Sequence, residues 1–120
     1  MLQAKLDYVG IRGTETIELK DHDLRQIGPF KCEFLPVTHS TPSGLMTVFD
    51  TPQGAIVHSS DFKLDPTPVD GRVTDLTRLR EISEDRGIRL LLADSTNAGS
   101  SGKTTSESEI GPVLEEIFAN

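Results

Sequence analysis

The chain has 120 residues and a mass of 13.1 kDa, so at roughly 150 residues per domain it has room for one hydrophobic core and not for two independent domains. Hydrophobic residues make up 35% and charged residues 26% of the sequence, which favours a folded globular domain over a disordered chain. Twelve basic and 19 acidic residues give a net charge of −7, so any contact with nucleic acid has to be local or mediated by a metal.

Two strands are predicted in the first third of the chain. Residues 14–19 (TETIEL) alternate polar and apolar side chains and include two threonines, the pattern of a half-buried strand. After the Gly28-Pro29 pair, residues 30–37 place Phe30, Cys32 and Phe34 on one face of a second strand. The polar run that follows ends this strand and leaves His39 in a loop.

A β-hairpin is expected next. Residues 45–50 (LMTVFD) and 55–60 (AIVHSS) flank the tetrapeptide Thr51-Pro52-Gln53-Gly54. This tetrapeptide suits a type I turn, because proline presets φ at the second position and glycine is favoured at the fourth. The following residues 61–71 carry two prolines and a glycine, which predicts an irregular segment.

The second half of the chain predicts a helix, a strand and a further helix. From Thr74, a candidate N-cap, apolar residues recur every three positions until Gly87, which favours a helix end. Residues 88–93 are predicted to form a buried strand, and the order strand, helix, strand implies a right-handed crossover to a parallel neighbour. The sheet is therefore expected to be mixed. Ser106-x-x-Glu109 is a capping-box pattern, so a terminal amphipathic helix is expected to begin there or at Ser108.

One cysteine, Cys32, excludes an intramolecular disulfide and a C-x-x-C metal motif, and it is expected to be a small buried hydrophobe. The N-terminal residues show no signal-peptide pattern, and the longest apolar run, residues 90–93, is far shorter than the roughly 20 residues that cross a membrane. These features predict a cytoplasmic protein without a membrane partner.

The predicted topology brings three polar residues to one edge of the sheet. His39, Asp61 and Asp94 each lie just beyond a strand, and the hairpin and the parallel crossover place these strand ends side by side. An imidazole and two carboxylates suit zinc or a similar divalent ion. Each residue also has a structural alternative, because a loop histidine bonds to backbone and aspartates cap turns. His58, inside the hairpin strand, is expected to pack or to support a ligand.

Motifs in a fixed order carry a resemblance to a known family. They are Val37-Thr38-His39-Ser40-x-Pro42, His58-x-x-Asp61-Phe62-Lys63-x-Asp65, Thr67-Pro68-Val69-Asp70-Gly71, and Asp94-Ser95-Thr96-Asn97-Ala98 with Thr105-Ser106-Glu107. Together they resemble bacterial ribonuclease J, in the β-CASP branch of the metallo-β-lactamase-fold hydrolases. The resemblance extends over nearly the whole chain and is most specific from Phe34 to Phe118.

The resemblance implies an α/β fold of the αββα sandwich type, with a mixed, mostly antiparallel sheet and flanking helices. It implies a centre of two divalent ions, zinc or manganese, that hydrolyses RNA in a cytoplasmic, homo-oligomeric 5′-exonuclease and endonuclease of RNA maturation and decay. His39 matches a histidine ligand and Asp61 the aspartate that bridges both metals. Ser95, Thr96 and Asn97, together with Asp94, match the stretch that lines the site.

Several family features are absent from the sequence. The H-x-H-x-D-H motif, a later ligand histidine, the β-CASP domain and the C-terminal domain have no counterpart, and residues 2–10 resemble the helix that follows the missing motif. Residues 1–120 are therefore expected to be a partial domain that is inactive alone. Ser59-Ser60 replaces the usual Thr-Gly before Asp61, Ser43 replaces an aspartate, and Gly99-Ser100 follows Ala98 in place of Glu and Pro.

Two other functions stay open. A metallo-β-lactamase-type hydrolase of small esters or thioesters is one, although the stretches 94–97 and 105–107 argue against it. A non-catalytic remnant that acts as a binding module is the other, and the missing ligands favour it.

Overall fold

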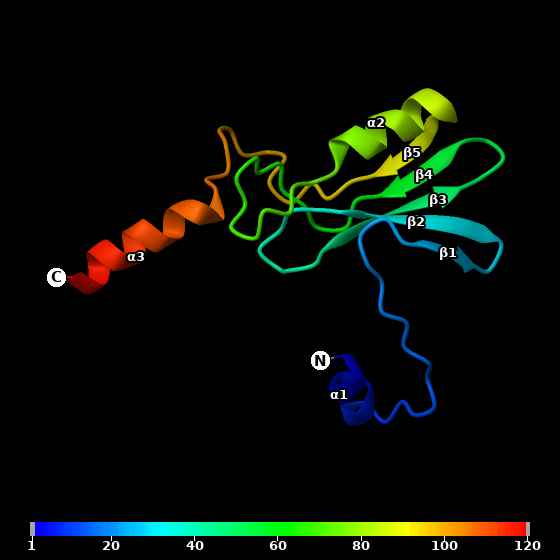
Figure 1. The fold of residues 1–120 in the computed structure, drawn as a ribbon, viewed down its shortest axis with the longest axis horizontal. Helices are drawn as coiled ribbons and strands as arrows, with labels where there is room; N and C mark the ends of the chain where they lie inside the picture. Colours follow the sequence, from blue (N-terminus) through cyan, green and yellow to red (C-terminus); the bar gives the residue numbers. More distant parts are fainter. Residues whose placement is uncertain (1, 120) are drawn as a thin grey trace.

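A five-stranded sheet lies at the centre of the computed structural model, which describes residues 2–119 (Figure 1). The strands follow one another in the sheet in chain order, β1 to β5. The elements are α1 (Leu2–Tyr8), β1 (Leu24–Ile27), β2 (Phe30–Pro36), β3 (Leu45–Asp50), β4 (Ala55–His58), α2 (Leu76–Asp85), β5 (Ile88–Leu92), the 3₁₀ turn η1 (Glu107–Glu109) and α3 (Ile110–Ala119). No helix among these residues is long and apolar enough to cross a lipid bilayer.

The sheet is mixed, as the strand and helix order predicts. Strands β1 to β4 pair antiparallel with their neighbours, and β4 pairs parallel with β5. The turn between β3 and β4 is closed by the Gly54 amide, which donates to the Thr51 carbonyl at 3.0 Å. The predicted hairpin and the predicted parallel pairing are both confirmed, and together they bring the C-terminal ends of β4 and β5 to one edge. The expectation of a buried strand over residues 88–93 is wrong, because β5 is the edge strand and its three leucines are about half exposed.

The strand predicted over residues 14–19 is wrong. These residues form no ladder, and Ile17 is 64% exposed. The first strand is β1, whose four residues are all exposed, and Gly28, at φ +56°, turns the chain directly into β2. An alternating pattern forms a strand only where a neighbour satisfies its backbone groups, and the tight turn supplies that neighbour to β1 alone.

Helix α2 covers one face of the sheet and completes the core. Its Ile82 packs among buried residues of β2, β3 and β4, including Leu35, Val48 and Val57. The cap is one residue later than predicted, because the Asp75 carboxylate and not Thr74 accepts from the Arg78 amide, at 2.8 Å. The helix ends before Gly87, whose φ of +75° confirms the predicted stop.

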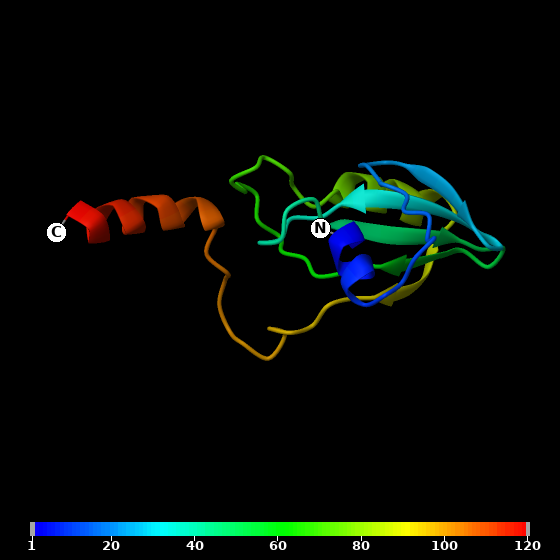
Figure 2. The same cartoon turned by 90° about the horizontal axis from the view of Figure 1, so that it is seen from below.

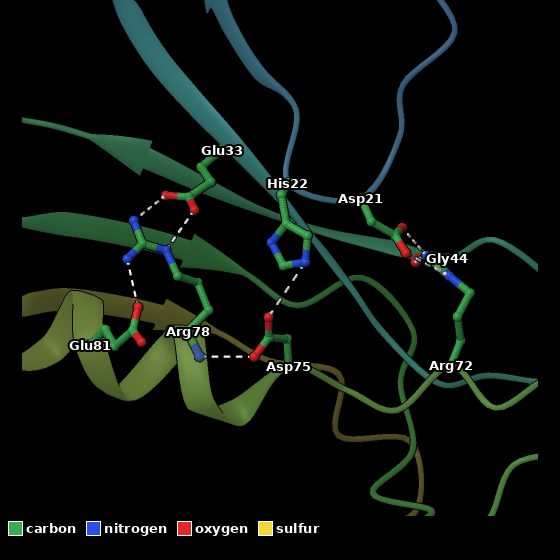
Figure 3. A network of polar contacts seen from close by, with 8 residues as sticks. All are labelled: Asp21, His22, Glu33, Gly44, Arg72, Asp75, Arg78 and Glu81. Carbon is green, nitrogen blue, oxygen red and sulfur yellow. Dashed lines mark hydrogen bonds and ion pairs between the residues drawn. The ribbon is translucent and has the colours of Figure 1, made fainter.

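Ion pairs fasten α2 to the sheet (Figure 3). The Arg78 guanidinium donates to both carboxylate oxygens of the buried Glu33 on β2, at 2.7 and 3.2 Å, and to Glu81 on its own helix. These bonds raise the pKa of Arg78, with Glu33 the largest cause. A buried carboxylate is stable only when it is paired in this way, so Glu33 and Arg78 set where α2 sits on β2.

The lone cysteine is buried in the sheet, as predicted. Cys32 is 0% exposed, and burial raises the pKa of its thiol. It therefore acts as a small apolar side chain of β2.

The two terminal helices lie away from the sheet (Figures 1 and 2). The radius of gyration is 17.7 Å, whereas a compact chain of this length has about 14 Å. The predicted cap is confirmed at η1, where the Ser106 hydroxyl accepts from the Ser108 amide, and α3 begins at Ile110 with Pro112 in its first turn. One mixed sheet with α2 on one face agrees with the predicted part of a metallo-β-lactamase-like sandwich.

Candidate metal site

A pocket of about 1030 Å³ opens at the edge of the sheet where β2, β4 and β5 end. His39, Asp61 and Asp94 line it together, as the predicted topology requires. Ser95, Thr96 and Asn97 also line it. Side chains at strand ends leave the packed face while their backbone remains rigid, so this edge is a natural place for a ligand.

His58 lies outside this pocket. It is an exposed residue of β4 opposite Thr47, and it lines a smaller neighbouring hollow of about 480 Å³. Asp61 and Asp94 border both hollows. His58 is therefore a neighbour of the pocket, not a member of its lining.

The backbone holds the imidazole of His39 in the structure. Its Nδ1 accepts from the Thr41 amide at 3.2 Å, which is the bond expected of a loop histidine. A neutral imidazole that accepts at Nδ1 carries its proton on Nε2, and only an unprotonated nitrogen binds a metal. If His39 held a metal through either nitrogen, the bond from the Thr41 amide would be lost.

Asp94 caps a turn, as its structural alternative predicts. Its Oδ1 accepts from the Thr96 hydroxyl at 2.6 Å and from the Thr96 amide at 3.0 Å. These two bonds are the main reason why the pKa of Asp94 lies below its usual value. Asp94 is thus an ionised carboxylate that faces the same pocket as His39.

Asp61 has no such structural task. Within residues 2–119 its exposed carboxylate makes no hydrogen bond or ion pair. Of the three predicted residues it is the one whose donor atoms are free for a ligand.

Further side chains close one wall of the pocket. The buried Asp65 accepts from the Thr67 amide at 2.9 Å and from the Ser106 hydroxyl at 2.8 Å, and these bonds, Thr67 first, lower the pKa of Asp65. Lys63 pairs with Glu107. The segment after Asp61 is thereby joined to the start of η1, a role that the motif alone does not reveal because the partners lie about 40 residues apart.

The donor types fit a metal, but the set is incomplete. His39 offers a nitrogen and Asp61 an oxygen in one pocket, whereas a catalytic zinc takes three protein ligands. Among the described residues no three His, Cys, Asp or Glu side chains converge closely enough to hold an ion. The described residues alone therefore do not form a complete metal site.

Comparison with known proteins identifies the relatives. The chain is 41% identical over 102 residues to ribonuclease J of Mycolicibacterium smegmatis, a match that covers 85% of this chain and 18% of that protein. It is 41% identical over 121 residues to ribonuclease J of Thermus thermophilus, covering 98% and 21%, and 45% identical over 92 residues to that of Helicobacter pylori, covering 77% and 13%. The chain is related to a segment of ribonuclease J. No protein-family model matches it.

The relationship confirms the resemblance carried by the motifs and sets its extent. The chain spans about a fifth or less of the length of these ribonuclease J relatives. One departure from the ribonuclease J motif has a clear geometry, because Ser60, at the usual glycine position, has a φ of +54°. This left-handed backbone favours glycine, and here a serine adopts it immediately before Asp61.

Proposed function

We propose that the protein carrying this segment is a metal-dependent RNA hydrolase of the ribonuclease J type. Identity of 41–45% to ribonuclease J over most of the chain supports this proposal most strongly. The shared pocket of His39, Asp61 and Asp94 supports it independently, because it contains the predicted ligand types at the predicted edge. RNA is then the substrate, and cleavage takes place both from the 5′ end and internally, in a cytoplasmic homo-oligomer that matures and degrades RNA.

In this proposal His39 would be a ligand to one metal ion and Asp61 would be the ligand shared by two, zinc or manganese. Bound divalent ions lower the pKa of water and neutralise charge on a phosphate group. Asp94 stays ionised through its bonds from Thr96 and contributes negative charge beside the imidazole. Because the chain is acidic overall, the metals supply the positive charge that attracts the RNA backbone to this pocket.

Residues 1–120 alone are proposed to be inactive. A metal activates water only when enough ligands hold it in fixed geometry, and the described residues provide no converging set of three. The same observation favours a second candidate, a segment that binds a partner without catalysis. The two candidates differ in whether the full-length protein needs Asp61 for turnover.

The test measures cleavage of labelled RNA by the full-length protein that carries this sequence, with added zinc or manganese. Asp61→Asn is compared with Asp85→Asn, which removes an exposed carboxylate at the end of α2 far from the pocket. We expect metal-dependent cleavage, abolished by the first change and retained with the second. Equal rates in both variants would exclude the proposed role of Asp61, and no cleavage by the unaltered protein would favour the binding segment.

A further inference from the structure

Thr74, which lies just before α2, joins two of the loops that line the pocket. Its hydroxyl accepts from the Thr38 amide at 3.0 Å and donates to the Lys63 carbonyl at 2.7 Å. Thr38 directly precedes His39, and Lys63 follows Asp61 by two positions. Thr74 is 8% exposed and Thr38 is 4% exposed, so water does not compete for these bonds.

The same junction includes a direct backbone contact. The Lys63 amide donates to the Thr38 carbonyl at 2.7 Å, which makes an isolated bridge between the two loops. The Thr38 hydroxyl donates to the Arg72 carbonyl at 2.7 Å. Thr74 therefore completes a small closed set of bonds that fixes the spacing between the His39 loop and the Asp61 loop.

A second buried hydroxyl makes the corresponding junction on the other side of Asp61. Ser59, 5% exposed, donates its amide to the Leu92 carbonyl at 2.9 Å, while its hydroxyl accepts from the Asp94 amide at 3.0 Å and donates to the Ser60 carbonyl at 2.6 Å. The end of β5 is thereby fastened to the end of β4. One hydroxyl thus stands at each junction between neighbouring loops of the pocket.

We infer that Thr74 and Ser59 are positioning residues that hold the loops of His39, Asp61 and Asp94 in one fixed arrangement. A hydroxyl donates and accepts at the same time, so one side chain can satisfy a buried amide of one segment and a buried carbonyl of another. Helix capping does not explain Thr74, because Asp75 caps α2. The consequence for metal binding rests on the proposed function, whereas the consequence for loop order does not.

The test uses the full-length protein that carries this sequence, four variants at Thr74 and Ser59, and a control variant. Thr74→Val and Ser59→Ala remove the hydroxyls, while Thr74→Ser and Ser59→Thr keep them. Glu33→Gln is the control, since it weakens the buried pair with Arg78 away from the pocket. Thr74→Cys, with a weaker hydrogen-bonding group of similar size, replaces Thr74→Val where the latter does not fold.

Hydrogen exchange, measured by mass spectrometry, tests the loop order. We expect Thr74→Val to speed exchange of the Thr38 amide about tenfold and to leave the Asp94 amide unchanged, as the loss of one buried bond predicts. Ser59→Ala should speed exchange of the Asp94 amide and leave the Thr38 amide unchanged. The inference would be overturned if either deletion raised exchange equally at the Thr38 and Asp94 amides. It would also be overturned if Glu33→Gln, compared at matched thermal stability, raised exchange at these amides as much as the deletions do.

Zinc affinity, measured by competition with a chromophoric chelator, tests the effect on the pocket. We expect each hydroxyl deletion to weaken zinc binding about tenfold, and Thr74→Ser and Ser59→Thr to restore it. Unchanged affinity in both deletions would overturn the positioning role. If the unaltered protein binds no zinc, the proposed metal site fails, and the exchange pattern still decides whether these hydroxyls order the loops.

Discussion

The hydroxyl of Ser60 donates to the carbonyl of Leu45 at 3.0 Å while the Ser60 backbone stands in the left-handed region at φ +54°. The bond joins the residue before Asp61 to the first residue of β3. A serine with this backbone is strained by about 1 kcal/mol relative to glycine, and one hydrogen bond offsets a strain of that size.

This balance predicts the order of stability for two substitutions. Ser60→Ala keeps the strain and loses the bond, so we expect its free energy of unfolding to be about 1 kcal/mol lower than that of the unaltered protein. Ser60→Gly loses the bond and the strain together, and its free energy of unfolding should lie close to that of the unaltered protein. Urea denaturation of the two variants measures the difference. Ser60→Ala as stable as Ser60→Gly would mean that the backbone at this position is not strained.

Asp61 and His58, three positions apart in one motif, should differ sharply in the full-length protein. Asp61 has no partner within residues 2–119 and lines the main pocket, whereas His58 is an exposed residue of β4 beside a smaller hollow. Asp61→Ala is expected to remove most bound metal and activity, and His58→Ala to cost about 10- to 100-fold at most. Bound metal and RNA turnover are measured for both. Equal metal content with equal rates would assign the bridging ligand to another residue.

How much the sequence predicts depends on the distance along the chain over which each feature is decided. The β3–β4 turn and the stop at Gly87 are set by neighbouring residues, and both are confirmed. The grouping of His39, Asp61 and Asp94 follows once the topology is known, because strand ends of known direction meet at one edge.

Features that depend on distant partners could not be predicted. Strand β1 (Leu24–Ile27) has an inconspicuous, fully exposed pattern and exists because the Gly28 turn presents it to β2. The hydroxyl of Thr74 fits a helix cap in the sequence, whereas in the fold it bonds to Thr38, 36 positions away. No local pattern shows such a contact, so its role is visible only in three dimensions.

Asp65 should make the attachment of η1 dependent on pH. Bonds from the Thr67 amide and the Ser106 hydroxyl lower the pKa of Asp65 in the folded chain. A carboxylate with a lowered pKa stabilises the fold above its unfolded pKa of about 3.9, and this contribution is lost as the pH falls through the folded value. We expect Ser106→Ala to raise the pKa of Asp65. This pKa is measured by following the NMR signal of the Asp65 carboxyl carbon as the pH changes.

The variant Asp65→Asn gives the corresponding stability experiment. At pH 7 the free energy of unfolding of Asp65→Asn should be lower than that of the unaltered protein. This difference should shrink as the pH falls below about 4. Asp85→Asn is the control for the loss of one negative charge, because Asp85 is exposed and lies at the end of α2. The same pH-dependent loss in both variants would show that general charge, not the bond to Ser106, is responsible.

The 120-residue chain alone should self-associate. Three leucines of the edge strand β5, Leu90, Leu91 and Leu92, are each about half exposed, and on α3 Ile117 is 61% and Phe118 83% exposed. Apolar surface on an edge strand and on a helix that no sheet covers favours contact between copies.

Sedimentation velocity at increasing concentration measures this association, and two variants of α3 locate it. Ile117→Gln removes an exposed apolar side chain and should shift the chain towards monomer, whereas Glu115→Gln introduces the same residue on the same helix and should not. The free energy gained by hiding such side chains scales with the apolar area buried, so the effect of Ile117→Gln should grow with protein concentration. A monomer that unfolds in one sharp transition well above about 60 °C would contradict the prediction. Mesophilic domains with complete cores melt at about 45–65 °C, so such a chain would have a complete core and no apolar face to hide.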